Sequence, residues 1–480
     1  GDALTPATAA KRLVTVMAKP GLYPGDVVHA APGDYNEGSA VYAGDPLILA
    51  PPASRPVNPA SRVIVPEGVT LVADEGRDVT FITGAEDNKT WGPNAVRSVT
   101  ALRGATVKGF TIRNGATLDQ TGGNFDNNIG GNVIAHRGSR ADAAVIADCI
   151  IQGGIARNGC GVAGGILRRC VVYGGTSGSG SIGLGTIYSR HENCVIGWYG
   201  YKSSLKNVMV LSHCGMYNSI YYSGNQGAAG DAELQSDGNN YPIVNSLICI
   251  NGRDSGAYTI QHVRNCMIRL INSAATGVTF DAETCSDNVF LSNWNDAKVG
   301  AFSPPDKLYY KPAADSPVID AGNAALVDYG PDATDLVGVP RVLNDNRIDI
   351  GAYEYDWRPV FAACLAPKKL VVETADPSVT TNDTGKLVVP SGAVSATWTV
   401  AAASAKLPVE VTGTGTLSLY LNGALVQSVT AAEGPQTLKL SLAKTGANAF
   451  RFVYEPGAAD DGAAFLGALD YSTGCMLIIR

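Results

Sequence analysis

Side chains capable of acid–base chemistry lie in the middle of this 480-residue chain, where Arg190, His191 and Glu192 directly precede the apolar residues 194–196. Residues 130–215 contain eight basic and three acidic side chains, although the net charge of the whole chain is −7. Four of the five histidines also lie in the central part of the chain. A local excess of positive charge attracts anionic ligands, and a histidine titrates near neutral pH. The central region is therefore suited to proton transfer on an anionic substrate.

A repeat along the chain must position these side chains. A polar residue, a small residue and a short apolar run recur at intervals of mostly 20 to 27 residues, beginning at Asp148, Arg169, Asn193, Asn207, Asn218, Asn245, Asn265 and Asp287. Asn207 and Asn218 are too close together to begin separate coils, so one of them must lie at another edge. This period indicates a solenoid whose coils bury their apolar faces against each other. Because the Leu-x-x-Leu-x-Leu frame of leucine-rich repeats is missing, the repeat favours a parallel β-helix.

Cysteines occupy the second position of this repeat at Cys149, Cys170, Cys194 and Cys266. In a solenoid, equivalent positions of successive coils lie above one another. We therefore expect these cysteines to stack as reduced, buried thiols that behave as small hydrophobic side chains.

The composition indicates an almost all-β protein. Gly accounts for 56 residues and charged residues for 16% of the chain, and short runs of Val, Ile, Thr and Tyr are bounded by Gly, Asn and Asp. One short helix is expected within residues 5–21, where it would cap the open end of the solenoid. The solenoid is predicted over residues 1–360. Alternating strands farther along predict a separate β-sandwich over residues 366–480.

Two segments carry a resemblance to a known family. The first is "GDVVHAAPGDYNEG" at residues 25–38, and the second is "SPVIDAGN" at 316–323 followed by "DLVGVPRVLNDNRIDIGAYEY" at 335–355. Both resemble segments of extracellular right-handed parallel β-helix proteins, the pectate-lyase-like family. The resemblance implies this fold and a carbohydrate-related role, but one such fold hosts lyases, hydrolases, epimerases and adhesins. Residues 366–480 resemble the jelly-roll accessory modules of carbohydrate-active enzymes, which bind sugar or stabilise the solenoid.

Charge and hydropathy limit the partners. No run approaches 18 uninterrupted apolar residues, and the net charge of −7 argues against nucleic acid and anionic membranes. The first ten residues lack the pattern of a signal peptide. We expect a secreted or cell-surface protein, bacterial-type extracellular or periplasmic, whose signal is absent from this chain.

Active residues of a β-helix come from neighbouring coils. We expect them among the polar side chains of the strand upstream of each repeat corner. We predict catalytic roles for His136, Arg137, Tyr188, Arg190, His191, Tyr201, Lys202 and Glu233. We predict substrate binding by Gln235, Lys206, His213, His262, Asp281 and Glu283.

The favoured function is a polysaccharide lyase acting on an anionic, uronic-acid-containing polymer. Elimination requires a cation on the substrate carboxylate, a base for the neighbouring proton and an acid for the leaving oxygen. Lys202 or His191 could be the base and Arg137 or Arg190 could hold the carboxylate. The proton donor could be Tyr188, Tyr201 or His136.

Two alternatives stay open. A glycoside hydrolase would need a carboxyl pair, for which Glu233, Asp281 and Glu283 are candidates. A non-catalytic polysaccharide-binding surface protein would need no convergence of these side chains.

No cofactor is certain from the sequence, and no ligand spacing marks a metal site. Ca²⁺ is conceivable in the loop over residues 114–131, where Asp119, Asp126, Asn127 and Asn128 offer oxygen ligands.

Overall fold

The computed structural model divides the chain into two compact units. Unit 1 comprises Gly1–Arg341 with Arg347–Glu354, and unit 2 comprises Val342–Asn346 with Tyr355–Arg480. The structure describes residues 9–44, 47, 59–118, 128–176, 182–197, 209–212, 214–222, 234–235, 242–251, 258–271, 278–303, 308–327, 333–341, 347–356, 365, 370–375, 379–381, 386–399, 404–442, 447–458 and 462–471.

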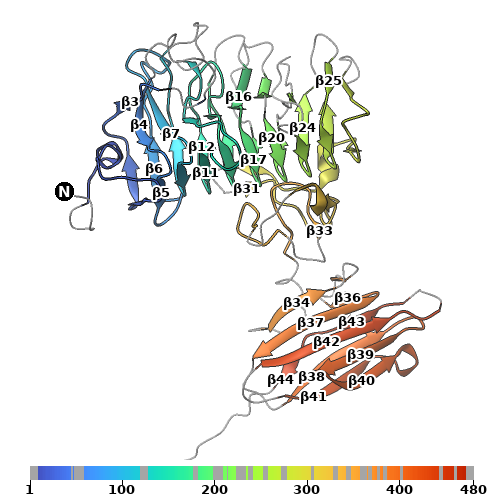
Figure 1. The fold of residues 1–480 in the computed structure, drawn as a ribbon. Coiled ribbons are helices and arrows are strands. Elements are labelled where there is room, and N and C mark those ends of the chain that lie inside the picture. The colour runs from blue at the N-terminus through green and yellow to red at the C-terminus, as the bar shows by residue number, and fades with distance from the viewer. Residues whose placement is uncertain are drawn as a thin grey trace, which may run out of the picture. The chain divides into compact units, whose positions relative to one another are not determined.

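Unit 1 is dominated by three long sheets, here named A, B and C (Figure 1). Sheet A contains, in spatial order, β1 (Val27–Ala30), β5 (Thr70–Ala73), β8 (Thr106–Lys108), β11 (Val145–Ala147), β14 (Ile166–Arg168), β17 (Arg190–Glu192), β20 (Gly215–Tyr217), β23 (Ile243–Val244) and β26 (Val263–Arg264). Sheet B contains β2 (Gly33–Tyr35), β6 (Thr80–Thr83), β9 (Thr111–Arg113), β12 (Ile150–Gln152), β15 (Val171–Tyr173), β18 (Val195–Gly197), β21 (Ile220–Tyr222), β24 (Leu247–Asn251), β27 (Met267–Ile271) and β29 (Val289–Phe290).

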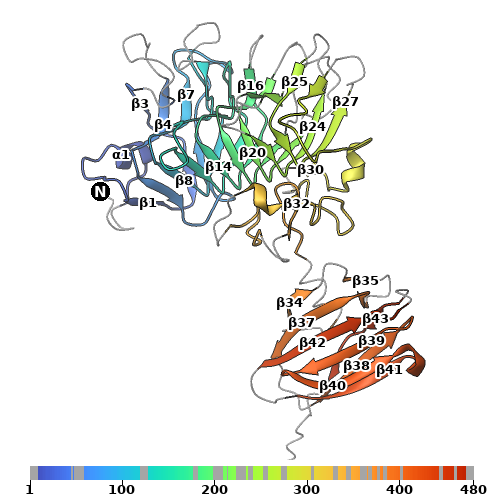
Figure 2. The same cartoon turned by 45° about the vertical axis from the view of Figure 1, so that its right-hand side comes forward.

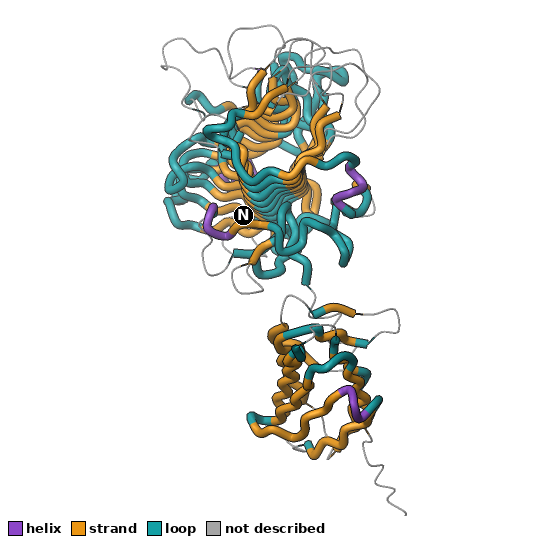
Figure 3. Tube along the Cα trace, turned by 90° about the vertical axis from the view of Figure 1, so that its right-hand side faces the viewer, coloured by secondary structure: helices purple, strands orange, loops and turns teal. Residues whose placement is uncertain are grey.

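Sheet C contains β3 (Ala40–Val41), β4 (Ala60–Val65), β7 (Val96–Ala101), β10 (Val133–Ala135), β13 (Val162–Ala163), β16 (Ile182–Ile187), β19 (Met209–Ser212) and β22 (Leu234–Gln235). A further parallel pair is formed by β25 (Tyr258–Ile260) and β28 (Val278–Phe280). From β4 to β24 the chain passes through sheets C, A and B in turn, and apart from β22 each of these strands pairs in parallel with the strand three positions later. We call one such set of three strands a coil. A view along the stack shows successive coils lying over one another (Figure 3).

The corner between sheets A and B has the same construction in successive coils. A residue with φ between 46° and 58° ends each passage from sheet A, at Asp148, Arg169, Asn193, Asn218, Asn245, Asn265 and Asp287. Asn and Asp tolerate this left-handed conformation because their short polar side chains bond locally. Six of the eight sequence repeats begin at such an Asn or Asp, and Arg169 is held by bonds of 2.6 and 2.9 Å to the Asp148 carboxylate. Asn207, the remaining position, lies outside the described residues.

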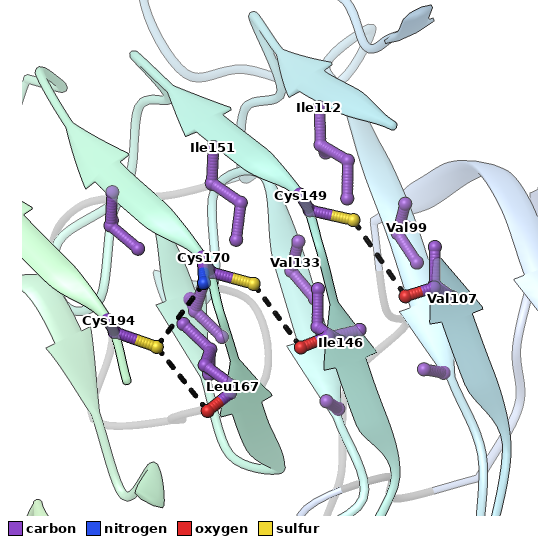
Figure 4. Packing of buried hydrophobic residues seen from close by; sticks show 14 of the residues in the cluster. Val99, Val107, Ile112, Val133, Ile146, Cys149, Ile151, Leu167, Cys170 and Cys194 are labelled. Atoms are coloured by element: carbon purple, nitrogen blue, oxygen red, sulfur yellow. Dashed lines mark hydrogen bonds between the residues drawn. The ribbon is translucent and has the colours of Figure 1, made fainter. Parts of the chain in front are cut away.

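The residue after this corner points into the coil and links it to the next one. The Cys170 amide donates to Cys194 Sγ at 3.5 Å, and the Cys194 amide donates to Ser219 Oγ at 3.1 Å. The ladder continues from Ser219 to Ser246 Oγ at 3.2 Å and from Ser246 to Cys266 Sγ at 3.4 Å. Figure 4 shows the first cysteines of this row beside the buried aliphatic side chains. The predicted stacking of buried, free thiols is confirmed for these cysteines.

The segment after the last coil folds back over the outer face of sheet B (Figure 2). It contains β30 (Phe302–Ser303) paired with β31 (Leu308–Tyr309), and β32 (Gly322–Asn323) paired with β33 (Arg347–Ile348). Two 3₁₀ helices, Trp294–Ala297 and Ala324–Leu326, join these strands. Phe302 and Tyr310 pack against the outward aliphatic side chains of sheet B. The outer face of sheet B from β15 to β27 is therefore filled by protein and is not a substrate surface.

The fully buried Arg341 anchors this returning segment. Its guanidinium donates to the carbonyl oxygens of Asp349, Gly351 and Tyr353, and it lies 3.3 Å from the Glu354 carboxylate. The carbonyl oxygens satisfy the buried guanidinium charge, and burial raises the pKa of the neighbouring Glu354 to about 9. The segment "DIGAYEY" therefore has a structural role, because it holds the returning segment in place around Arg341.

A short helix lies at the N-terminal end of unit 1. The helix α1 (Leu13–Met17) buries Leu13 and Met17 in the same core as Val63 and Val65 of sheet C. Since these side chains cover the apolar interior of the first coils, α1 supports the predicted cap at this end. No helix of the described residues is long and apolar enough to span a membrane.

Unit 2 contains two antiparallel sheets around one hydrophobic core. One sheet has the order β34 (Leu370–Ala375), β37 (Gly392–Thr399), β42 (Ala447–Glu455), β39 (Thr416–Leu421) and β40 (Ala424–Thr430). The other has β35 (Thr380–Thr381), β36 (Leu387–Val389), β43 (Ala464–Leu466), β38 (Ser404–Val411) and β41 (Gln436–Ser441), with β44 (Asp470–Tyr471) beside β38. A 3₁₀ helix, Ala431–Glu433, follows β40. Burial alternates along β38 and β42, as expected for strands with one face on the core.

Candidate functional site

The outer face of sheet C, where polar substrate-binding side chains are predicted, is apolar in its central coils. Ile134 and Ala163 are outward residues of sheet C, and both are fully buried with Ile187, Ile129 and Leu47 in one cluster. This cluster corrects the expectation of an open groove there, because a substrate could not displace such packing. The polar side chains that follow these strands lie instead at the corner where the chain turns from sheet C into sheet A.

A pocket of about 220 Å³ opens at this corner of three successive coils. We call it the arginine pocket, and its lining is Arg137, Gly138, Ser139, Arg140, Ala143, Gly165, Ile166, Tyr188 and Arg190. Residues 137–143 connect β10 to β11, Gly165 precedes β14, and Tyr188 lies between β16 and β17. Three of the predicted site residues, Arg137, Tyr188 and Arg190, are therefore brought together from different coils.

Glycines make the floor of the pocket. Gly165 has a φ of +71°, and a Cβ there would lie 2.7 Å from Ala135 Cβ and 2.9 Å from the Ala144 carbonyl oxygen. No side chain fits in that space, so the backbone of residues 161–165 ("GVAGG") comes close to the preceding coil. Tyr188 of the next coil has a φ of 56°. That conformation is uncommon for a bulky residue and is often found at functional sites.

Two cation–π contacts arrange the aromatic and cationic side chains. The Arg137 guanidinium lies over the Tyr188 ring, with 4.9 Å between its central carbon and the ring centroid. The Arg190 guanidinium lies 3.8 Å from the centroid of the Tyr217 ring. These contacts hold planar donor groups in fixed orientations, which is the geometry in which arginine binds carboxylates with two parallel hydrogen bonds.

Glu192 organises the arginines behind the pocket. Its carboxylate accepts from Arg168 Nε and from Arg190 Nε, each at 2.7 Å, and lies 3.9 Å from Arg140 Nη2. Burial raises the pKa of Glu192, but the Arg168 hydrogen bond and the charges of Arg168, Arg190 and Arg140 outweigh it and lower the pKa. Glu192 is thus ionised at neutral pH. A second carboxylate, Asp142, accepts from Ser139 Oγ at 2.6 Å and pairs with Arg103 at 3.0 Å. The lining itself contains three arginines and no acidic side chain, which favours an anionic ligand.

His191 faces the opposite side of its strand from Arg190. It pairs in register with Leu167 and Met216, which line the interior, and its exposed fraction is 0%. Neither ring nitrogen has a hydrogen-bond partner. Burial lowers the pKa of His191 to about 3, so the ring is neutral at physiological pH. The predicted role of His191 as a base is wrong, because a side chain inside the coil cannot reach a substrate.

The other described candidates do not line the pocket. His136 is 6% exposed, although it adjoins Arg137 in sequence. His262 is at the equivalent corner three coils beyond Arg190, one residue before the Ile243–Val263 pair. Asp281 and Glu283 lie one coil farther, where Asp281 Oδ1 accepts from the Glu283 amide at 2.9 Å. With strands about 4.8 Å apart, His262 is about 14 Å from Arg190 along the stack.

Several predicted residues cannot be placed. Tyr201, Lys202, Lys206, His213 and Glu233 lie outside the described residues, and only the backbone of Gln235 is described, in β22. Of the oxygen ligands considered for Ca²⁺, Asp119, Asp126 and Asn127 lie outside too, and Asn128 is 2% exposed. Among the residues that the structure describes, no group of three or more His, Cys, Asp or Glu side chains is arranged to hold a metal ion.

Sequence reasoning missed Ser139 and Arg140 as lining residues and Arg168 as a partner of Glu192. The signal was the short run Arg137-Gly-Ser-Arg140, in which a Gly-Ser turn presents two cations in one corner. It has no counterpart in the other coils, so the repeat could not reveal it.

Comparisons with known proteins add little. No protein-family model matches the chain, and no curated protein does. The secreted serine protease VesC from Vibrio cholerae is 19% identical with a TM-score of 0.20, and the match covers 25% of this chain and 27% of that one. A family two carbohydrate esterase from Clostridium thermocellum in complex with cellohexaose is 16% identical with a TM-score of 0.17, over 20% and 30%. The chain spans less than a third of either protein, and a likeness this small carries no argument about fold or activity.

Proposed function

We propose that unit 1 is a right-handed parallel β-helix of the pectate-lyase-like kind that binds an anionic polysaccharide at the arginine pocket and cleaves it by β-elimination beside a uronic acid. The observation that carries the proposal is the convergence of three arginines and one tyrosine on a pocket whose lining contains no acidic side chain. A cationic pocket of this kind selects a carboxylate-bearing sugar.

The chemistry assigns a role to each side chain. A guanidinium of Arg190 or Arg137 binds the uronate carboxylate and stabilises the negative charge that develops when the C5 proton leaves. The Tyr188 phenol oxygen, in its ionised form, takes that proton. The C5–H electron pair forms the C4–C5 double bond, the C4–O bond breaks, and the phenol returns the proton to the leaving oxygen. The products are an unsaturated uronate and a new hydroxyl end.

Hydrolysis by a carboxyl pair is less well supported by this pocket. A glycosidase needs two carboxyl groups facing one glycosidic bond. The two carboxylates beside the lining are already bonded, Glu192 to Arg168 and Arg190, and Asp142 to Ser139 and Arg103. Asp281 and Glu283 lie in a coil beyond His262.

A polymeric, uronate-rich substrate implies a protein that works outside the cytoplasm, either secreted or attached to the cell surface. In this proposal unit 2 is a jelly-roll accessory module over residues 366–480. Its role is to bind sugar or to stabilise the end of unit 1.

The test is incubation with pectins, alginates and glycosaminoglycans while the ultraviolet absorbance of the unsaturated product is followed. We expect a rise with one polymer class, and loss of that rise in Arg190→Ala and Tyr188→Phe. Arg451→Ala, at an exposed position of β42 in unit 2, is the control that should keep full activity. Flat traces with no new reducing ends on any polymer would contradict the enzyme proposal and favour a binding protein.

A further inference from the structure

A second cavity lies at the other end of the same sheet A strands. It has a volume of about 680 Å³ and is lined by Val72, Ala73, Asp74, Glu75, Gly76, Arg77, Asp78, Lys108, Gly109, Asp148, Arg169, Leu336, Val337 and Gly338. We call it the corner trough. Ile166, at the start of β14, lines the arginine pocket, whereas Arg169, just after β14, lines the trough. The two sites are therefore separated by the length of one short strand, about 10 Å.

The trough runs across several coils and has two side walls. Its floor consists of the corner residues Gly109, Asp148 and Arg169, which belong to three successive coils. The Arg77 side chain extends from the coil before that of Gly109 and donates from Nη1 to the Arg169 carbonyl oxygen at 3.4 Å. The returning segment supplies the opposite wall at Leu336 and Val337.

The charges in the trough are compensated by one another. Four acidic and three basic side chains line it. Asp148 accepts from Arg169 at 2.6 Å and lies 3.9 Å from Lys108 Nζ, and Asp74 lies 2.6 Å from His29 Nδ1. Because acidic and basic side chains are present in nearly equal number, the trough has no strong preference for an anion or a cation. The arginine pocket, with cations and no acidic lining, has the opposite character.

The lining offers what a neutral sugar needs. Carboxylates of Asp74 and Glu75 accept hydrogen bonds from hydroxyl groups, and Lys108 donates them. Lys108 is 51% exposed, so its ammonium group can turn to a ligand. Val337, which is 57% exposed, offers apolar surface to the C–H faces of a sugar ring without packing loss in the free protein.

From this arrangement we propose that the corner trough is a second binding site and that its ligand is a neutral sugar residue or short neutral oligosaccharide. The proposal goes beyond the elimination chemistry and does not depend on it, since no trough residue lines the arginine pocket. If both hold, the polymer is one in which neutral sugars accompany the uronic acid, as side chains or as neighbouring residues.

The experiment measures binding of neutral oligosaccharides of glucose, galactose, mannose, rhamnose and arabinose to the full chain by isothermal titration calorimetry. We expect at least one to bind. Lys108→Ala and Val337→Asp should each weaken that binding by about tenfold, since each removes a contact of roughly the strength of one hydrogen bond. Both positions are exposed, so the variants should unfold at the same temperature as the parent chain.

Matched controls lie elsewhere in unit 1. Lys298, 48% exposed and paired with Asp315 at 2.5 Å, tests the loss of a similar lysine, and Val289, 51% exposed, tests the loss of a similar valine. Lys298→Ala and Val289→Asp should bind like the parent chain. Absence of any neutral ligand would overturn the proposal. Neutral-sugar binding that is unchanged in both Lys108→Ala and Val337→Asp would also overturn it. Binding of uronate oligosaccharides alone at the trough would overturn it too.

One variant separates this proposal from the first. Arg190→Ala should lower the elimination rate by about 100- to 1,000-fold and leave neutral-sugar binding intact. A chain that cleaves nothing but binds neutral oligosaccharides in a Lys108-dependent way would refute the lyase and support the trough. A chain that cleaves a uronate polymer but binds no neutral oligosaccharide would support the lyase and refute the trough.

Discussion

The two corners at the ends of the sheet A strands are built differently, although they belong to the same coils. At the corner between sheets A and B, each described repeat places a left-handed residue before a small inward side chain. In the central coils that side chain accepts a hydrogen bond from the preceding coil. At the corner between sheets C and A, a seven-residue loop at 137–143 is followed in the next coil by Gly164-Gly165 and in the third by Tyr188.

The difference indicates that one corner stabilises the stack of coils and that the other provides the candidate site. At the repeating corner, the same hydrogen bond between an amide and a side chain links each coil to the next. This gives successive coils the same register. A corner that varies can place unlike side chains next to one another, and there a phenol and several guanidinium groups meet. Substitutions should therefore change activity at one corner and stability at the other.

The largest effect is expected at the variable corner. Arg190→Ala should lower kcat/KM on a uronate polymer by about 100- to 1,000-fold, or about 3–4 kcal/mol, because a preorganised charge that stabilises the developing anion is lost. The melting temperature should change little, since Glu192 keeps its 2.7 Å bond from Arg168. Steady-state kinetics with thermal unfolding of the same sample is the measurement. Equal activity of variant and parent would remove Arg190 from the site.

The next effect is expected at the repeating corner. Cys194→Ala should lower the free energy of unfolding by about 2 kcal/mol, because it opens a small cavity and leaves the Cys170 amide without its acceptor. Urea denaturation followed by tryptophan fluorescence measures this change.

The control is Cys194→Ser, which keeps an acceptor and should cost less. Ser219 and Ser246 already occupy the equivalent position in later coils. Elimination activity should be unchanged in both variants. If Cys194→Ala lost activity without losing stability, the proposed division between the two corners would fail.

The sequence predicted the repeating corner better than the variable one, for a physical reason. Asn193-Cys194 and Asn265-Cys266 repeat because the central coils place a left-handed residue before a small ladder side chain. Arg137 and Tyr188 meet only because three different loops stack, and nothing in one loop encodes the neighbour of another. His191 failed for a simpler reason. A shift of one residue along a strand exchanges the inner and outer faces, and register is not visible in a three-residue strand.

The buried His191 makes the stability of the interior depend on pH. With a pKa of about 3 in the folded chain and near 6.5 in the unfolded chain, the unfolded state binds more protons between these values. Stability therefore falls as the pH is lowered through this window. The loss attributable to His191 is about 2 kcal/mol between pH 6.5 and pH 5.

The His191→Leu variant should lack this part of the pH dependence. It should also be more stable than the parent at neutral pH, since two unpartnered buried nitrogens are removed. Denaturation at several pH values checks both statements, with His29→Leu, at an exposed position, as the control. A His191→Leu variant that keeps its fold but loses activity would show that the ring reaches the substrate after all.

The smallest effect is expected at the rim of the arginine pocket. Arg140 is 46% exposed and its Nη2 lies 3.9 Å from the Glu192 carboxylate, so solvent and salt weaken its charge. Arg140→Ala should reduce affinity for a uronate oligosaccharide only about threefold, and the reduction should shrink further at high salt. Calorimetry at two ionic strengths measures both, with Arg103→Ala as a control, because Arg103 is 60% exposed and pairs with Asp142 outside the pocket lining. A loss as large as that of Arg190→Ala, and insensitive to salt, would mean that Arg140 closes over the bound sugar and belongs to the interior of the site.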